Sequence, residues 1–194
     1  MSRNVHSGFS DGSTCDAVAL GAGAFLYVGT GTGLHTYSHS SAALGDFIGS
    51  ATGELVGVHC LLNITEDAMA DGRVVRGDWV IMHTDSEVVW GYLTRATRPG
   101  MPYLVPLVAL MRRRIHFLSL NGLNIDVRWV PRANNTAADR LARAALQSLL
   151  RETRLLRENT PFTIFLVDWR LSGSMQDALF QATRGMATTV FAVN

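Results

Sequence analysis

Apolar and polar positions near the start of the chain follow the two-residue period of β-strands. A β-prone segment over residues 5–10 stops at Asp11, where a turn is expected, and two further segments cover 19–28 and 34–39. The glycine-rich stretch 29–33 favours a hairpin loop, because glycine adopts the positive backbone dihedrals of tight turns. The pattern therefore predicts three antiparallel strands, with Asp11 at a strand end.

The period then lengthens to that of a helix. Glu54, Leu55 and Val58 recur at helical spacing, and Ser50 or Thr52 is the expected cap, so Glu54 is expected in about the first turn. Strands and helices then alternate, and we expect a strand over 79–84, a helix from Ser86 to about 97, a long helix over 103–120, a strand over 124–130 and a helix capped by Thr136.

The last part of the chain, residues 155–194, carries two apolar segments and no motif that suggests chemistry. Residues 162–169 and 188–193 favour strands, and 174–183 favour a helix. A piece so short and apolar should pack on the rest of the chain or, because exposed strand edges invite pairing, form a homodimer or bind a protein partner. We therefore divide the chain into a domain over 1–154 and an extension over 155–194.

Composition narrows the class of protein. The 194 residues are 47% hydrophobic, which suffices for one folded domain with a real core. The longest apolar runs are far shorter than a bilayer span, and no signal segment precedes the first strand, so a soluble protein without membrane contact is expected. Cys15 and Cys60 fit neither a disulfide framework nor a metal spacing, which favours free thiols and an intracellular, reducing compartment.

Charge limits how nucleic acid could be bound. The formal net charge is only +1, so the field of the whole molecule attracts polyanions weakly. Any such binding must come from local clusters of arginine, which supplies all 17 basic residues. The absence of lysine fits a coding bias as well as a preference for bidentate phosphate contacts. The run Arg112–Arg114 is either a solvated helix face or a strip that contacts phosphates.

Four acidic residues form the candidate site: Asp11, Glu54, Asp85 and Asp139. Taken singly, each has an ordinary role as a turn residue, a solvated helix charge or a residue at a helix start. As a set they fall at strand ends and helix starts, which one edge of a sheet can bring together. Clustered carboxylates bind hard divalent cations such as Mg²⁺, and a pair of such ions can carry out phosphodiester hydrolysis.

The frames around these acids resemble those of the type 1 ribonuclease H family, in the variant common to plant, archaeal and retroelement enzymes. Four motifs occur in the family's order: Asp11-Gly12-Ser13, Glu54-Leu55-Val56-Gly57, Thr84-Asp85-Ser86, and the stretch Val130–Ala142, which begins with Val-Pro-Arg and ends with Ala-Asp-Arg-Leu-Ala. The glycine-rich segment 21–24 resembles the family's second strand.

The resemblance implies an α/β fold: a ribonuclease-H-like mixed five-stranded sheet with helices on its faces, to which the extension adds a small C-terminal appendage. It also implies that the four acids bind two Mg²⁺ ions, which Mn²⁺ can replace, and that the protein is an endonuclease cutting the RNA strand of an RNA–DNA hybrid. Contacts with the hybrid, including its 2′-hydroxyl groups, are then expected at positions near the acids: Gly12, Ser13, Ser50, Thr52, Ser86, Arg132 and Asn134.

Departures from the family pattern keep other functions open. Ser50 to Thr52 replace asparagines that often precede the second acid, and no histidine lies between Trp129 and Asp139, so Arg132 or Asn134 would take its place. The main alternative is a non-catalytic ribonuclease-H-like module that binds RNA or serves as a structural part of a ribonucleoprotein. A resolvase or 3′ exonuclease of the same superfold fits less well, because its carboxylate frames differ and the Val-Pro-Arg ending argues against it.

Overall fold

A five-stranded sheet with helices on both faces forms the body of the protein, in a computed structural model that describes residues 3–15, 19–30, 33–44, 49–157, 165–166 and 190–191. The strands of this sheet are β1 (Val5–Cys15), β2 (Ala19–Thr30), β3 (Gly33–Leu44), β4 (Trp79–Thr84) and β5 (Asn124–Trp129). The helices are α1 (Ser50–Ala70), α2 (Glu87–Leu93), α3 (Leu104–Leu120) and α4 (Thr136–Arg157), and the 3₁₀ turn η1 (Arg132–Asn134) precedes α4.

The sheet is mixed, as predicted. Its strand order is β3-β2-β1-β4-β5, with antiparallel pairing among the first three strands and parallel pairing of β4 with both β1 and β5. Parallel neighbours need a crossover connection, and α2 with α3 supplies it between β4 and β5. The central strand β1 is therefore paired along both edges.

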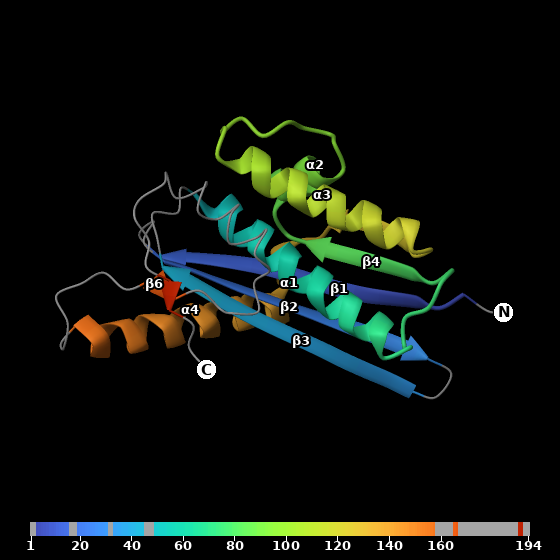
Figure 1. The fold of residues 1–194 in the computed structure, drawn as a ribbon, viewed down its shortest axis with the longest axis horizontal. Coiled ribbons are helices and arrows are strands. Elements are labelled where there is room, and N and C mark those ends of the chain that lie inside the picture. Colours follow the sequence, from blue (N-terminus) through green and yellow to red (C-terminus); the bar gives the residue numbers. More distant parts are fainter. Residues whose placement is uncertain are drawn as a thin grey trace.

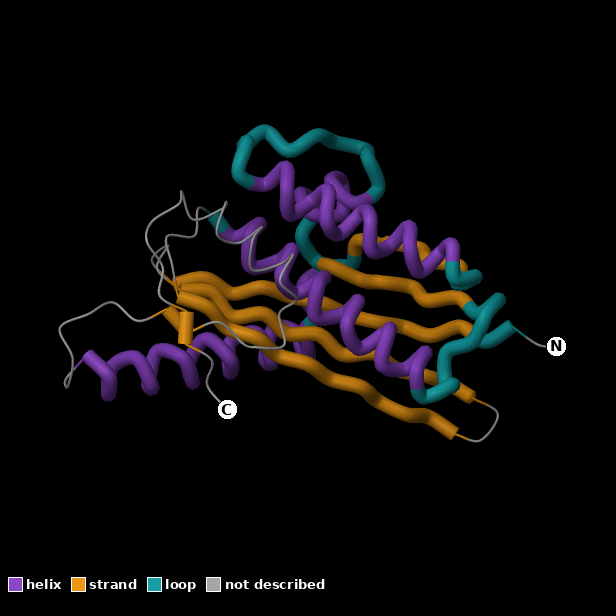
Figure 2. Tube along the Cα trace, viewed as in Figure 1, coloured by secondary structure: helices purple, strands orange, loops and turns teal. Residues whose placement is uncertain are grey.

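The helices lie in two layers. Figure 1 shows α1, α2 and α3 on one face of the sheet and α4 on the other, and the same layers can be followed by colour in Figure 2. Glycines permit close approach on both faces: a side chain at Gly57 would overlap the carbonyl of Asp11, and one at Gly23 would overlap the backbone of α4 at Ala142. Gly57 thus lets α1 lie close to β1.

The main core lies between the sheet and the helices α1 and α3. Fully buried aliphatic side chains fill it, among them Leu26, Leu55, Leu61, Leu107 and Met111. Each such side chain contributes about 2 kcal/mol when it leaves water. Among the described residues, no helix is long and apolar enough to cross a membrane.

The first strands are longer than predicted. β1 does not stop at Asp11 but runs on to Cys15, because β2 pairs with it as far as the pair Cys15–Ala19. β3 likewise runs on to Leu44, paired with the start of β2. The prediction that Asp11 ends a strand was therefore wrong, because a local pattern does not reveal how far a neighbouring strand continues to pair.

The start of α1 also differs from the prediction. The N-cap is Gly49, no side chain caps the helix, and α1 begins at Ser50. Neither Ser50 nor Thr52 is the cap, and Glu54 lies in the second turn.

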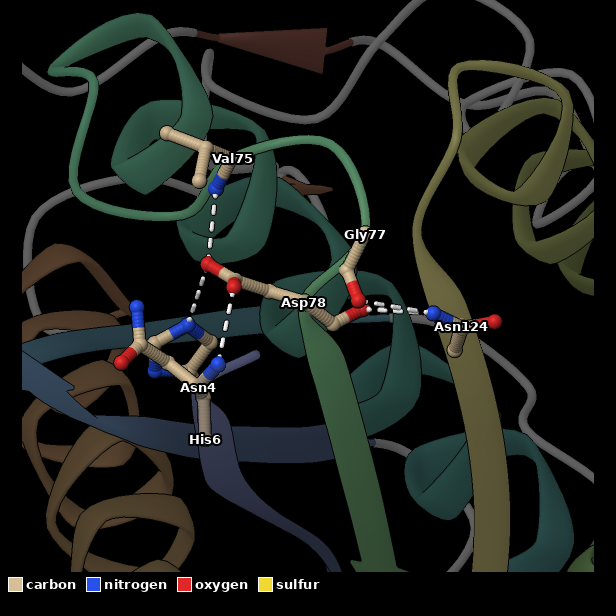
Figure 3. A network of polar contacts seen from close by, with 6 residues as sticks. All are labelled: Asn4, His6, Val75, Gly77, Asp78 and Asn124. Carbon is tan, nitrogen blue, oxygen red and sulfur yellow. Dashed lines mark hydrogen bonds and ion pairs between the residues drawn. The ribbon is translucent and has the colours of Figure 1, made fainter. Parts of the chain in front are cut away.

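A polar network around Asp78 closes the end of the sheet where β4 starts (Figure 3). Asp78 is 2% exposed, accepts hydrogen bonds from the backbone N–H groups of Asn4 and Val75 at 3.0 Å each, and lies 3.1 Å from Nε2 of His6. Asn124 donates from its side chain to the backbone carbonyl of Asp78. Burial alone would raise the pKa of Asp78, but the hydrogen bonds outweigh it and hold the pKa below its ordinary value.

The C-terminal extension contributes two short strands to the described residues. β6 (Phe165–Leu166) and β7 (Val190–Phe191) pair in parallel, and β6 contacts β3. Both lie inside the segments predicted as strands, whereas the helix predicted over 174–183 lies outside the described residues. Helix α4 continues to Arg157, past the predicted domain division at 154.

Candidate active site

Asp11 and Asp85 are brought together by the parallel pairing of β1 with β4. That pairing ends at Ser10 and Thr84, so the next residue on each strand is one of the two acids. Asp11 remains within β1, opposite Gly23 of β2, while Asp85 follows the end of β4 as predicted. Strand register alone thus places two carboxylates side by side.

Glu54 reaches the same place from α1, which crosses β1 at very short range. The space that a side chain would need at Gly12 is filled by the backbone of Gly53 and Glu54, and the space at Gly57 is filled by the Asp11 carbonyl. Only glycine leaves room for this approach. Glycines on both elements therefore determine how near the Glu54 carboxylate comes to Asp11.

The three carboxylates form a group that can hold a cation. One oxygen from each of Asp11, Glu54 and Asp85 lies within 4.8 Å of the others. Asp11 Oδ2 and Glu54 Oε2 are buried without a hydrogen-bond partner, which is unfavourable unless a cation satisfies them. A donor set made only of carboxylate oxygens fits a hard ion such as Mg²⁺ or Mn²⁺.

Crowding makes ionisation of two of these groups unfavourable. Burial, followed by the charges of Asp85 and Asp139, raises the pKa of Asp11 to about 7. Burial, followed by the charges of Asp11 and Asp85, raises the pKa of Glu54 to about 9. Without a cation Glu54 therefore keeps its proton at neutral pH, whereas a bound cation favours the charged form.

Asp139 lies at the edge of this group, where arginine engages it. Its side chain is 18% exposed, and its charge contributes to the raised pKa of Asp11. Its Oδ1 accepts hydrogen bonds from Nη2 of Arg132 and Nε of Arg143, both at 3.0 Å. The structure thus brings three of the four predicted ligands into one group and holds the fourth beside them.

Asn135 is a site residue that the sequence analysis missed. Its side chain is fully buried, and its Nδ2 donates to the Ser10 carbonyl and to Asp85 Oδ1, both at 2.9 Å. Its own carbonyl accepts the N–H of Asp139 at 3.1 Å and so starts α4. Asn135 therefore occupies the N-cap position predicted for Thr136, and the preference of asparagine for N-caps was the available signal.

Comparison with solved structures places this arrangement among known folds. RNase H1 from the halophilic archaeon Halobacterium salinarum has a TM-score of 0.55 and 22% identity, covering 75% of this chain and 99% of that chain. The N-terminal RNase H domain of Rv2228c from Mycobacterium tuberculosis has a TM-score of 0.56 and 22% identity, covering 77% and 99%. LC11-RNase H1, solved in complex with an RNA/DNA hybrid, has a TM-score of 0.54 and 20% identity, covering 75% and 99%.

The chain has the fold of type 1 ribonuclease H. The predicted resemblance and the predicted fold class are confirmed. No protein-family model matches the sequence, and no curated protein matches it.

On this ribonuclease H fold, some of the residues expected to contact a hybrid are accessible. Ser13 is half-buried beside the acids, and the exposed members are Ser50, Arg132 and Asn134. Arg132 has the most open side chain of the site's ion pairs, with 69% of it exposed. These residues remain available for contact with a nucleic acid.

Other expected contact residues of the ribonuclease H fold are engaged within the protein. Thr52 is fully buried. Gly12 lies against α1, and hydrogen bonds from its backbone lower the pKa values of Asp11 and Glu54 against the larger effect of burial. The Oγ of Ser86 accepts the backbone N–H of Val89 at 3.3 Å and caps α2, as predicted, while its own proton stays available for donation.

The arginine run on α3 serves mainly to hold helices together. Arg112 donates to the carbonyl of Tyr92 in α2, and Arg114 donates to Nδ1 of His59 in α1 at 2.7 Å. Burial, then the charge of Arg114, lowers the pKa of His59 to about 3, so its ring is neutral and can accept this bond. Of the run, Arg113 alone is exposed, which argues against a continuous phosphate-binding strip.

Proposed function

We propose that this chain is a divalent-cation-dependent endonuclease that hydrolyses the RNA strand of RNA–DNA hybrids. The observation that carries the proposal is the group formed by Asp11, Glu54 and Asp85, in which one oxygen from each residue lies within 4.8 Å of the others, in a ribonuclease H fold. Mg²⁺ is the proposed ion, two of them bind, and Mn²⁺ can replace it.

The four acidic residues have different proposed roles in binding the two ions. Asp11, Glu54 and Asp85 hold the first ion, and Asp139, at the edge of the group, completes the site for the second. When bound, a pair of divalent ions supplies the Lewis-acid chemistry of an in-line phosphodiester displacement. The close packing of α1 against β1 keeps water away from the inner oxygens, of which Asp11 Oδ2 and Glu54 Oε2 are already buried.

The substrate class is proposed from the accessible residues at the rim. Arg132 and Asn134 are exposed and can donate hydrogen bonds to backbone phosphates. The hydroxyls of Ser13 and Ser86 are suited to contacts with 2′-hydroxyl groups, which distinguish RNA from DNA. A structural neighbour, LC11-RNase H1, was solved with an RNA/DNA hybrid, which supports the same class of substrate here.

Incubation of the full chain with an end-labelled RNA–DNA hybrid, with Mg²⁺ present or chelated, tests the proposal. We expect the RNA strand to be cut only with the ion, to leave 5′-phosphate ends, and duplex DNA and single-stranded RNA to stay intact. Asp11→Asn and Asp85→Asn should each abolish cleavage, because each removes an anionic ligand without changing side-chain volume. Binding of the hybrid should weaken steeply with salt.

Asp126→Asn is the matched control, because Asp126 pairs with Arg128 at 2.7 Å on β5 and lies outside the carboxylate group. It should cut the hybrid at the wild-type rate. Unchanged cleavage by both active-site variants would rule out the site. Binding of the hybrid by the wild type without any cleavage in Mg²⁺ or Mn²⁺ would favour a non-catalytic RNA-binding module instead.

A further inference from the structure

Asn135 occupies a junction that links the candidate site to the start of α4. It follows the turn η1 (Arg132–Asn134), and its carbonyl accepts the first hydrogen bond of α4 from the Asp139 N–H. Its side chain is fully buried. The backbone of Asn135 is therefore held in place by the helix, and the amide it carries has little freedom to move.

The side-chain amide of Asn135 links β1, at the residue before Asp11, to Asp85, which directly follows β4. Its Nδ2 has two protons, and it donates to the carbonyl of Ser10, directly before Asp11, and to Oδ1 of Asp85, both at 2.9 Å. The indole N–H of Trp129 adds a bond to the Asp85 carbonyl at 3.0 Å. Both the side chain and the backbone of Asp85 are thus tied to neighbouring residues of the site.

These hydrogen bonds matter because the three carboxylates repel one another. One oxygen from each of Asp11, Glu54 and Asp85 lies within 4.8 Å of the others, so the three groups repel one another when ionised and no cation is bound. A donor on Oδ1 counters that repulsion and holds the Asp85 carboxylate in one orientation. Mg²⁺ demands near-ideal octahedral geometry, whereas Ca²⁺ accepts flexible coordination by more ligands, so displaced carboxylates penalise Mg²⁺ more.

We propose that Asn135 is a positioning residue that fixes the Asp85 carboxylate beside Asp11 in the geometry Mg²⁺ requires, and that it thereby favours Mg²⁺ over Ca²⁺. The inference rests on the proposed function, since it concerns the same ion site. It adds the residue that arranges the ligands and the ion selectivity that follows from it.

Asn135→Ser is the informative variant. The side-chain oxygen of Asn135 accepts no hydrogen bond from the described residues, so the start of α4 does not depend on it, and serine is itself a favoured N-cap residue. The short serine hydroxyl has one proton and cannot replace both hydrogen bonds of the amide. Asn124→Ser is the matched control, because the Asn124 amide also donates to two backbone carbonyls, at 3.0 and 3.3 Å, at the other end of the sheet.

The measurement is titration calorimetry of metal-free full-length protein with MgCl₂ and with CaCl₂. We expect Asn135→Ser to weaken Mg²⁺ binding by about 10-fold or more, and Ca²⁺ binding by clearly less. With hybrid as substrate, kcat should fall while KM for the hybrid stays near the wild-type value. Asn124→Ser should keep wild-type affinities for both ions.

Wild-type Mg²⁺ affinity in Asn135→Ser, or an equal loss for both ions, would overturn the inference while leaving the proposed function intact. Loss of folding in metal-free Asn135→Ser, seen by circular dichroism, would also overturn it, because the residue would then support the fold rather than one carboxylate. A wild-type chain that binds Mg²⁺ but cuts no hybrid would defeat the proposed activity alone. A wild-type chain that binds no divalent ion would defeat both.

Discussion

At the scale of single residues, Glu54 is a group whose negative charge the folded chain strongly opposes. Its pKa rises from 4.5 to about 9, chiefly through burial, while that of Asp11 rises to about 7. At a pH between the ordinary pKa of each carboxyl group and its raised pKa, the group is protonated in the folded state and ionised in the unfolded state. The metal-free protein is therefore most stable at low pH within this window, and this contribution is lost as pH rises through about 7 and 9.

Glu54→Gln should remove part of that pH dependence. In EDTA, the melting temperature of the wild type should fall as the pH is raised from 5 to 9. The melting temperature of the variant should fall less, because the glutamine side chain does not ionise. At pH 9 the metal-free variant should be more stable by roughly 2 kcal/mol. Thermal melts across this range check the prediction. Saturating Mg²⁺ should stabilise the wild type and have little effect on the variant, and a variant as pH-sensitive as the wild type would contradict the assignment.

The acids themselves could be predicted from sequence, but not their supporting partners. Asp11, Glu54 and Asp85 each lie within a distinctive short sequence motif, and such motifs can be recognised from the sequence alone. Asn134 and Asn135 are identical neighbours, yet one is exposed and the other fully buried. The difference arises from the turn η1 and from contact with β1, which the local sequence does not encode.

At the scale of elements, the site depends on how closely α1 lies on β1. The two elements meet through Gly12 and Gly57, and a Cβ atom at either would overlap backbone atoms of the other element. Sequence periodicity predicted α1, but it misplaced the helix start and the end of β1. β1 continues because β2, the next strand, pairs with it as far as Cys15, and α1 starts at Ser50 without any side-chain cap, so neither boundary coincides with a local sequence signal.

Gly57→Ala should push α1 away from the sheet. Alanine favours an isolated helix by about 1 kcal/mol, but overlap with the Asp11 carbonyl should outweigh this and destabilise the protein by about 2 kcal/mol or more. Glu54 would move with the helix, so cleavage should also fall. Gly29→Ala, at a strand position with open space around it, is the control and should change neither denaturant midpoint nor rate. Equal effects of the two substitutions would count against the close-contact explanation.

Asp78 stabilises the opposite end of the sheet, where β4 starts. Its folded pKa is lowered, so its contribution to stability is present above the unfolded value of 3.8 and is lost as pH falls below it. Asp78→Asn should therefore destabilise the protein by about 3 kcal/mol at pH 7, and the gap to the wild type should narrow towards pH 3. Urea unfolding at several pH values provides the measurement. Asp126→Asn, which breaks a more exposed ion pair, should cost under about 1 kcal/mol at pH 7.

At the scale of the whole molecule, the ribonuclease H body and the C-terminal extension have separate expected roles. All four acids lie before residue 155, and of the two short strands described in the extension, β6 contacts β3 at the edge of the sheet. The extension carries the apolar run Phe162–Val167. Its packing role follows from composition alone, and the sequence does not reveal which surface it covers.

Removal of the residues after Glu158 should lower either the solubility or the free energy of unfolding, the latter by several kcal/mol in order of magnitude, since large apolar side chains lose their burial. Metal-dependent cleavage by the folded remainder should persist. Differential scanning fluorimetry, size-exclusion chromatography and the hybrid assay together give the answer. A truncated protein that stays monomeric and fully stable yet loses cleavage would show that the extension belongs to the active site.

The central place of β1 has a consequence for synthesis on the ribosome. β1 emerges first and β2 soon pairs with one of its edges, but its other neighbour, β4, is made only after β3 and α1. Until then the nascent chain carries an open strand edge in what becomes the middle of the sheet, and open edges recruit foreign strands. The strand that bears Asp11 is thus open to misassociation along one edge until β4 has left the ribosome and paired with it.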